Sequence, residues 1–443
     1  MTQNSPKISV VVAVYNVEKF LEQCLTSIAG QTFRNTEIIC IDDGSTDSSP
    51  DILQKFANAD ERFRIYRKEN EGLGGASARN LGLSYARGEY VSILDSDDFF
   101  EPEMLEHALR KAEATNADIV VFGGYEYNQR NGDTYKVASI LSEKKIPAKE
   151  VFDYRDCAND IFQLSQGMAW NKLYRRSFLN EHNIRFQKIK YTDDVYFTFA
   201  NMILAKRITV LREFLCYYRI NSGVNQTAGM DNYPDSVYLP YIELKKFLIA
   251  QGAWALVESS FLSCAASFMR YCYDNMSRFD SFSYLHDKLR NEVFKELGLA
   301  DKTADYFFDG RIFQWIEQVK NNSAGELCFM AARSHGSEAT TGILRFRFPY
   351  EKIPQESKIA IIGAGIMGRH YYSQLMLSGY CDVVLWAEKE NKFNLHYIKP
   401  IDELKKCSFE YVVIAYMQPR LVKPIVKWLK KIGISDEKII IGG

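Results

Sequence analysis

The stretch SILDSDDFFEP (residues 92–102) puts three aspartates where a predicted strand ends. Carboxylates this close repel one another and raise each other's pKa, unless a cation lies among them. Asp95, Asp97 and Asp98 could therefore hold a divalent metal ion. They could equally form a solvated acidic turn that caps a helix starting near Glu101–Pro102, because Asp favours N-caps and Pro the first helical position. The stretch alone does not decide between the two.

The elements that must position these aspartates follow from hydrophobic periodicity. The apolar run ISVVVAV (8–14) is typical of a strand that is covered on both faces. Four more strands are expected at 37–41, 63–68, 90–94 and 118–124. Helices are expected between them at 18–30, 48–58, 75–86 and 102–115. This alternation predicts a parallel sheet with helices on both faces.

Sheets of this kind bind ligands at the carboxyl ends of their strands. Asn16 follows the first predicted strand, and Asp42 and Asp43 end the second. Asp95 and Asp97 end the fourth. Polar groups at three strand ends on one sheet edge are the geometry of a nucleotide-and-metal pocket. This favours a metal site over an acidic turn for Asp95 and Asp97.

Length and composition limit the classes of protein to which this chain can belong. A chain of 443 residues predicts two or three domains. A net charge of −1 and the lack of a basic tail argue against nucleic acid as a partner. The nine scattered cysteines, without a C-x-x-C pair, fit a reducing cytosol better than disulfides or a zinc site. No run approaches 18 apolar residues, so we expect a soluble cytoplasmic protein, at most peripheral at the inner face of a membrane.

The hydrophobic pattern changes after about residue 230. We expect a catalytic domain at 1–230, a mainly helical region at 231–345 and a small Rossmann-like α/β domain at 355–443. Helix 420–432 is basic and amphipathic. It could lie on a membrane, although covering the small sheet is the favoured use.

The C-terminal segment KIAIIGAGIMG contains a dinucleotide fingerprint. Gly363, Gly365 and Gly368 follow a strand and open a helix, and Glu388 ends the next strand. The same glycines also serve close packing of a helix on a strand. Because only about 85 residues remain from this point, too few for a second nucleotide half and a substrate domain, a regulatory or assembly role is favoured over NAD binding.

An ordered series of segments resembles the family 2 glycosyltransferases, which have the A-type nucleotide-sugar fold. The series is VVVAVYN (10–16), ICIDDGSTD (39–47), NEGLGGASARNLGLSYARGEY (70–90), DSDD (95–98), GMAWNKLYRRSFL (167–179) and YTDDVYF (191–197). It covers about the first 225 residues and is more specific than any one member. The resemblance implies an α/β fold with a mixed, mostly parallel sheet. It also implies a UDP-sugar donor and Mn²⁺ or Mg²⁺ as cofactor, which would neutralise the departing diphosphate.

The resemblance also assigns roles to single residues. Asp97 is the main metal ligand, Asp95 contacts the ribose and metal-bound water, and Asp98 touches the sugar or caps the next helix. One of Asp42 and Asp43 accepts a hydrogen bond from uracil, and the other forms an Asx turn. The further donor-binding candidates are Ala13, Tyr15, Asn16, Arg79, Ser96, Trp170 and Lys172.

Two of these candidates have structural alternatives. Arg79 could bind phosphate at a helix N-terminus or form a salt bridge to the DSDD loop. Trp170 could stack on a sugar face or lie in the core. Ala13 stands where the family often has proline, which bears only on local rigidity.

The resemblance makes Asp194 the catalytic base, which accepts the proton of an acceptor hydroxyl while one displacement inverts the anomeric centre. Asp193 stands where the family usually has glutamate. The alternative for Asp194 is an N-cap of the following helix. The segment YYRINSGVNQT (217–227) resembles one that closes over the pocket in relatives, but it lacks their occasional histidine ligand.

The implied function is non-processive transfer of a hexosyl or N-acetylhexosaminyl group to a hydroxyl of a glycan, glycolipid or glycoprotein, as in polysaccharide biosynthesis. The Q-x-x-R-W motif of processive synthases is absent. The alternatives are an NAD-binding oxidoreductase and an inactive sugar-binding or scaffold protein. The sequence leaves the donor sugar, the acceptor, the choice of metal and a homo-oligomeric state open.

Overall fold

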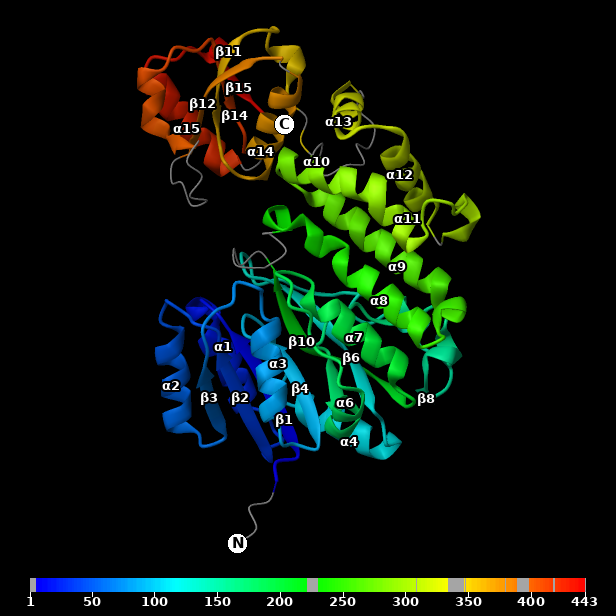
Figure 1. Ribbon diagram of the computed structural model, residues 1–443. Helices are drawn as coiled ribbons and strands as arrows, with labels where there is room; N and C mark the ends of the chain where they lie inside the picture. Colours follow the sequence, from blue (N-terminus) through cyan, green and yellow to red (C-terminus); the bar gives the residue numbers. More distant parts are fainter. Residues whose placement is uncertain are drawn as a thin grey trace. The chain divides into compact units, whose positions relative to one another are not determined.

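The computed structural model describes residues 5–220, 230–307, 309–333, 346, 348–378, 380–388, 398–416 and 419–442. The chain divides into two compact units (Figure 1). Unit 1 comprises Met1–Ser267 with Asp305–Phe308, and unit 2 comprises Phe268–Ala304 with Asp309–Gly443. The expected division into three domains at 1–230, 231–345 and 355–443 stays a prediction.

Unit 1 is built on one ten-stranded sheet with the order β3-β2-β1-β4-β9-β6-β10-β5, in which β7 also pairs with β6 and β8 with β10. The strands are β1 Ile8–Val14, β2 Thr36–Asp42, β3 Phe63–Arg67, β4 Tyr90–Asp95, β5 Phe99–Phe100, β6 Ile119–Asn128, β7 Thr134–Lys136, β8 Val151–Phe152, β9 Lys172–Arg175 and β10 Ile208–Ile220. Strands β1 to β4 are parallel, as are β6 and β10, whereas β9 runs antiparallel to both β4 and β6. The predicted mixed, mostly parallel α/β fold is confirmed.

Helices cover both faces of this sheet (Figure 1). The helices of unit 1 are α1 Glu18–Ala29, α2 Ser49–Ala59, α3 Ala76–Tyr85, α4 Met104–Thr115, α5 Ile161–Leu164, α6 Arg176–His182, α7 Asp193–Leu204 and α8 Leu239–Ala250, and α9 Trp254–Asn275 begins in unit 1 and ends in unit 2. The apolar stripe of α1, which includes Phe20, Leu21 and Cys24, is buried in the core beside Val10 and Val12 of β1. On the other face Gly82 lets α3 approach β1, because a Cβ there would lie 2.4 Å from Val11 Cγ1.

One predicted helix start was wrong. The helix expected from Glu101–Pro102 begins at Met104. The backbone N–H of Glu101 donates to Leu215 O of β10 (2.9 Å), which keeps this residue extended after the β5 pairing. The acidic loop therefore belongs to the sheet edge rather than to the helix that follows it.

Unit 2 combines helices with a second sheet. Its helices are α10 Phe279–Lys288, α11 Phe294–Leu297, α12 Gly310–Asn321, α13 Ala324–Arg333, α14 Ile366–Ser378 and α15 Pro419–Lys431. Its strands, all parallel in the order β13-β12-β11-β14-β15, are β11 Lys358–Ile362, β12 Asp382–Glu388, β13 Lys399–Pro400, β14 Tyr411–Ile414 and β15 Ile439–Ile441. Alternate residues of β11 face α14 and α15, so the sheet is covered on both sides, as in a Rossmann-like unit (Figure 1).

Two helical segments lie on either side of β14 in the sequence of unit 2. The segment Ile401–Lys406, which precedes β14, forms a 3₁₀ helix. The predicted helix at 420–432 is present as α15, and its apolar side packs on the small sheet. Among the residues that the structure describes, no helix is both long enough and apolar enough to cross a membrane.

Candidate functional site

The carboxyl ends of three neighbouring strands bring acidic side chains to one edge of the unit 1 sheet. In the parallel register Val14 of β1 lies opposite Asp42 of β2, and Ala13 lies opposite Asp95 of β4. Asn16 follows β1 in a left-handed conformation, with a φ of 48°. Its Oδ1 accepts a hydrogen bond from the Thr46 N–H (2.8 Å), which joins the loops after β1 and β2.

The two aspartates at the end of β2 have different partners. Oδ1 of Asp42 accepts the backbone N–H of Ser45 (2.9 Å), so this residue forms the turn. Oδ1 of Asp43 accepts from the Lys68 ammonium (2.8 Å), and its Oδ2 accepts from the Asn70 amide (3.3 Å). Burial raises the pKa of Asp43, and Lys68 partly offsets this rise. Asp42 is thus tied to the backbone through Oδ1, with its Oδ2 3.4 Å from Arg67 Nε, whereas both oxygens of Asp43 are held by side chains.

The DSDD loop after β4 concentrates negative charge. Burial raises the pKa of Asp97 to about 6, and the neighbouring Asp95 carboxylate adds to the rise. No other residue of the described ranges hydrogen-bonds the Asp97 carboxylate. Asp98 is buried; its Oδ1 accepts the Arg219 N–H (2.8 Å), while its Oδ2 has no hydrogen-bond partner in the part of the chain that the structure describes. Burial and the Asp97 charge raise the pKa of Asp98 well above its ordinary value. The Ser96 side chain between these carboxylates is buried as well.

Arg79 in the first half of α3 connects this loop to Asp193, the neighbour of the predicted base. Its Nη2 donates to Asp95 Oδ1 (2.7 Å) and its Nη1 to Asp193 Oδ2 (2.6 Å). The guanidinium is largely buried and lies 5.5 Å from the centroid of the Phe186 ring. Although burial opposes the charge, the carboxylates of Asp193 and Asp95 raise the pKa of Arg79 above its usual range. The salt bridge to the DSDD loop that was expected as one alternative is therefore present, and a second ion pair, to Asp193, joins residues 114 positions apart in sequence.

Asp194 lies next to this ion pair but is not part of it. No other residue in the described ranges hydrogen-bonds its carboxylate, and the side chain is partly exposed. Burial raises the pKa of Asp194 to about 7, with a further rise from the Asp193 charge. A carboxylate with a pKa near neutrality and no internal partner is suited to accept a proton.

The backbone before Asp194 is strained. Thr192 has a φ of 60°, which β-branched residues rarely adopt. Its Oγ1 lies 2.5 Å from the carbonyl oxygen of Ser236, a contact that helps to hold this conformation. Thr192 is the N-cap residue of α7, and its side chain accepts no capping hydrogen bond from the first turn of that helix. The N-cap interpretation of Asp194 is therefore wrong, because Asp194 already lies in the first turn.

Glycines bring the loop of Arg79 close to the loop of Asp194. Gly74 has a φ of 71°, and a Cβ at this position would lie 2.5 Å from the carbonyl oxygen of Lys190. Asn80 adds a second connection, because its side chain exchanges two hydrogen bonds of 2.9 Å with the backbone of Phe186. The glycine-rich segment thus serves a close approach of two loops.

Two predicted sugar-binding residues need correction. Trp170 is 3% exposed and stacks on Tyr218, so it lies in the core. The Lys172 ammonium is fully buried in β9, where it donates to Met168 O (2.7 Å) and Asn171 Oδ1 (2.7 Å) and lies 3.1 Å from Ser165 Oγ. Burial lowers its pKa to about 7. The structure brings neither side chain to a surface that a ligand can reach. Tyr15, in contrast, is 48% exposed beside Asn16.

Arg219 at the end of β10 was missed by the sequence prediction. Its Nε donates to Asp97 O (2.6 Å), its N–H to Asp98 and its Nη2 to Gln23 Oε1 (2.9 Å). It lies 5.2 Å from the Phe99 ring centroid. Arg219 is 1% exposed, and it therefore fixes the backbone of the DSDD loop. The sequence does contain a signal for this residue: Arg219 is the one charged residue in the apolar run FLCYYRI. An arginine in a buried strand needs partners for its charge, so its position predicts a role in positioning nearby acidic or carbonyl groups. The rest of the segment, 221–227, lies outside the described residues.

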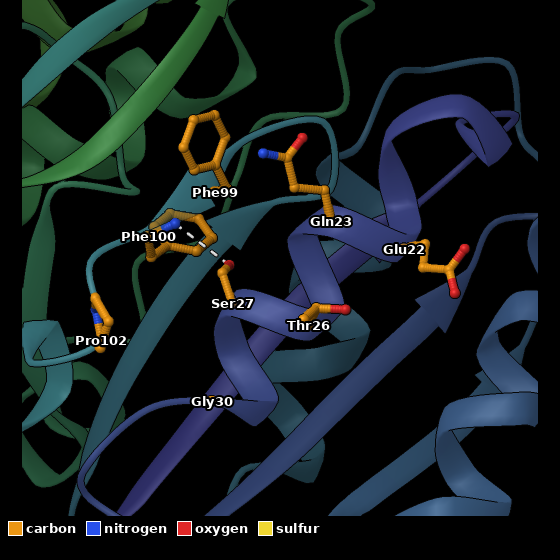
Figure 2. A pocket seen from close by; sticks show the side chains of 8 residues that line it. All are labelled: Glu22, Gln23, Thr26, Ser27, Gly30, Phe99, Phe100 and Pro102. Atoms are coloured by element: carbon orange, nitrogen blue, oxygen red, sulfur yellow. Dashed lines mark hydrogen bonds between the residues drawn. The ribbon is translucent and has the colours of Figure 1, made fainter.

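A cavity of 570 Å³ lies behind this loop, between α1 and β5 (Figure 2). Its lining includes Gln23 and Phe99, which both contact Arg219. Figure 2 shows Ser27 accepting a hydrogen bond from the Phe100 N–H (3.2 Å) and the Glu22 carboxylate pointing away from both phenylalanine rings. None of the predicted site residues lines this cavity. The predicted donor-binding residues therefore lie outside this cavity.

The residues at the DSDD loop fit a hard divalent ion only in part. Within the described ranges, no group of three His, Cys, Asp or Glu side chains could surround a metal. Asp97 offers a carboxylate without an internal partner, and Asp95 offers the oxygen that Arg79 does not bind. Mg²⁺ and Mn²⁺ bind well through one or two carboxylates when phosphate oxygens complete the shell. The donor set is compatible with a metal that arrives with a diphosphate.

The glycine fingerprint of unit 2 has a packing role. A Cβ at Gly368 would lie 1.8 Å from Gly363 O, so this glycine permits close contact of helix and strand. Both carboxylate oxygens of Glu388 are used, by the Ala364 N–H (2.8 Å) and by the Tyr416 hydroxyl. Glu388, the acid that would bind a ribose, therefore already has internal partners. Dinucleotide binding by Gly363, Gly365 and Gly368 stays a prediction.

Comparisons with known proteins agree with the geometry of unit 1. The model of the family "Glycosyl transferase family 2" matches residues 9–182. A cholesterol galactosyltransferase of Borreliella burgdorferi is 32% identical over 339 residues, which cover 74% of this chain and 88% of that protein. EpsH of Bacillus subtilis is 35% identical over 221 residues, 49% of this chain and 62% of that protein. The chain thus spans less than two thirds of EpsH.

A solved structure shares the fold. The crystal structure of Staphylococcus aureus TarS 1–349 in complex with UDP superposes with a TM-score of 0.53, over 75% of this chain and 94% of that one. The sequence identity over this region is 21%. At this identity the likeness supports the A-type fold and no finer conclusion.

Proposed function

The chain belongs to the family 2 glycosyltransferases, and on that premise we propose that it moves one sugar from a UDP-sugar to a hydroxyl of a glycan, glycolipid or glycoprotein. The transfer inverts the anomeric centre and is not processive. UDP is proposed from the Asp42–Asp43 pair, and TarS, which shares the fold, has been crystallised with UDP. A hydroxyl as acceptor agrees with a relative named as a cholesterol galactosyltransferase, because cholesterol carries one hydroxyl.

The observation that supports this proposal most is the ion-pair bridge through Arg79. One guanidinium binds Asp95 of the acidic loop at 2.7 Å and Asp193, the neighbour of Asp194, at 2.6 Å. It thereby holds the proposed donor side and the proposed base side at one sheet edge. An inactive scaffold would have no need for a partner-free carboxylate with a pKa of about 7 beside this bridge.

The residues of this chain account for each proton and bond of the proposed reaction. Asp194 accepts the proton of the acceptor hydroxyl as its oxygen forms a bond to the anomeric carbon. The bond between that carbon and the diphosphate oxygen breaks on the opposite face, and UDP leaves with the electron pair. A divalent ion held by Asp97 and Asp95 would supply neutralisation of the diphosphate charge. Arg219 keeps the DSDD backbone in position through its bond to Asp97 O.

A donor-hydrolysis screen tests the function. We expect slow, Mn²⁺- or Mg²⁺-dependent release of UDP from one sugar nucleotide of a panel that includes UDP-glucose, UDP-galactose and their N-acetylhexosamine counterparts. Hydrolysis needs no acceptor, since water can attack the anomeric carbon. GDP- and dTDP-sugars are the matched controls. Release from these controls alone would contradict the uridine assignment, and no release from any donor would contradict transferase activity.

Asp43 is proposed as the uracil-binding member of its pair, because Asp42 Oδ1 accepts the Ser45 N–H of the turn and its Oδ2 lies 3.4 Å from Arg67 Nε. Asp43→Ala is expected to weaken UDP binding by about 1–3 kcal/mol, the cost of a lost charge-assisted hydrogen bond. Isothermal titration calorimetry measures this. The control is Lys68→Gln, which removes the partner of Asp43 and keeps the carboxylate. Unchanged UDP affinity in Asp43→Ala would show that this residue does not recognise the base.

A further inference from the structure

Helix α15 of unit 2 has one side that packs on the small sheet and another that carries exposed lysines. Its sequence PRLVKPIVKWLKK contains five basic residues and no acidic residue. Val422 and Leu429 are buried in the core of the small sheet, beside Ile362 and Ile414. The apolar side of the helix is therefore already covered by the small sheet.

The cationic side is a regular row of lysines. Lys423, Lys427 and Lys431 are four residues apart, so they lie along one side of the helix. All three are exposed, and within the described ranges none of them forms an ion pair. Their neighbour Lys430 differs, because it pairs with Asp436 at 2.6 Å. Three positive charges that have no ion-pair partner among the described residues thus lie on one side of the helix.

Apolar side chains border this row. Leu421 is 42% exposed. Trp428 is half-buried, and the Lys405 ammonium lies 5.8 Å from the centroid of its ring. Tryptophan and leucine next to lysines are typical of helices that lie at a membrane interface, where the rings reach the headgroup level and the cations meet anionic lipid. The border supplies an apolar anchor in addition to charge.

We propose that α15 docks this protein on a membrane surface rich in anionic phospholipid. The chain as a whole has a net charge of −1, so the attraction is local to this helix and not a property of the whole surface. A row of lysines on one straight helix side, with apolar residues at its border, fits a planar surface with an apolar interior. Nucleic acid offers no apolar layer to Leu421 and Trp428. The proposal does not depend on the transferase function.

Vesicle co-sedimentation of the full-length chain tests the proposal. We expect binding to phosphatidylcholine vesicles that contain about one third phosphatidylglycerol, and little binding to pure phosphatidylcholine. The triple variant Lys423→Gln, Lys427→Gln, Lys431→Gln is expected to lose about 100-fold in partitioning, since each lysine near an anionic surface contributes about fivefold. Leu421→Gln is expected to lose a few-fold. Raising the salt to about 0.5 M should weaken wild-type binding, because the exposed charges are then screened.

The matched control changes three exposed lysines of the same unit that lie outside α15, namely Lys295, Lys352 and Lys358 to Gln. It makes the same change in net charge and should keep binding within about twofold. Full binding by the α15 triple variant, equal loss in the control, or equal affinity for neutral vesicles would each overturn the proposal. Tighter binding to double-stranded DNA than to the anionic vesicles would overturn it in favour of nucleic acid. An unchanged melting temperature shows that the variants fold.

Discussion

Asp97→Asn is expected to abolish metal-dependent turnover and to leave the fold intact. The proposed metal supplies several kcal/mol of charge stabilisation to the departing diphosphate, so a loss of about 1000-fold or more is expected when its main ligand is removed. Stability should be unchanged or slightly higher. The Asp97 carboxylate has no hydrogen-bond partner among the other described residues, and burial together with Asp95 already raises its pKa to about 6. Asparagine removes a charge that the folded chain does not stabilise.

Two measurements distinguish loss of metal binding from a general defect. The Mn²⁺ concentration that gives half-maximal donor hydrolysis should rise in Asp97→Glu, which keeps the charge and moves the oxygens, whereas Asp97→Asn should show no response to Mn²⁺. Asp51→Asn, an exposed position in the first turn of α2, is the control with the same chemical change. Wild-type activity and metal response in Asp97→Asn would remove Asp97 from the proposed site.

The positions of the acidic loops could be predicted because local sequence specifies them. The apolar β1 predicts a strand that is buried on both faces, and its parallel neighbours then end at the same edge. The register of Val14 with Asp42 and of Ala13 with Asp95 follows from that arrangement. The loops that follow long, apolar strands can therefore be placed at one sheet edge from the sequence.

The partners of these residues could not be predicted in the same way. Arg79 and Asp193 are 114 positions apart, and no sequence period connects them. The short strand β9, inserted between β4 and β6, has four residues and shows no alternation. Its pairing carries Lys172 into the interior, and Trp170 just before it lies in the core as well. Both residues were therefore assigned to a ligand when the fold uses them for packing.

The buried charges of the site also depend on tertiary structure. Lys172 is retained in the interior because oxygens of Met168, Asn171 and Ser165 surround its ammonium. Arg219 is retained because its guanidinium donates to the Asp97 carbonyl and the Gln23 amide oxygen, while the Asp98 carboxylate accepts its backbone N–H. In each case the residue type signals an unusual position, and only the fold shows which groups compensate the charge.

Asp194→Asn is expected to reduce sugar transfer by about 10²–10⁴-fold, the usual contribution of a general base. The amide cannot accept the acceptor proton, yet it has the shape of the carboxylate. UDP affinity should persist, because Asp43 and the DSDD loop are unchanged. Melting temperature should also persist or rise, since burial and the Asp193 charge raise the pKa of Asp194 to about 7 and its charge is therefore unfavourable in the folded chain.

The pH dependence gives a second test of Asp194, because a base must be deprotonated to act. With a pKa of about 7, the carboxyl is protonated below this pH, so wild-type transfer should rise as pH increases through about 7 and then level off. The residual rate of Asp194→Asn should lack this rise. Asp193→Asn is the contrasting variant: it breaks the buried pair with Arg79, so it should lower the melting temperature as well as the rate. If transfer in Asp194→Asn stays within a few-fold of wild type and keeps the rise near pH 7, Asp194 is not the base, and the proton must pass to Asp193, whose ion pair with Arg79 would then have to open during each turnover.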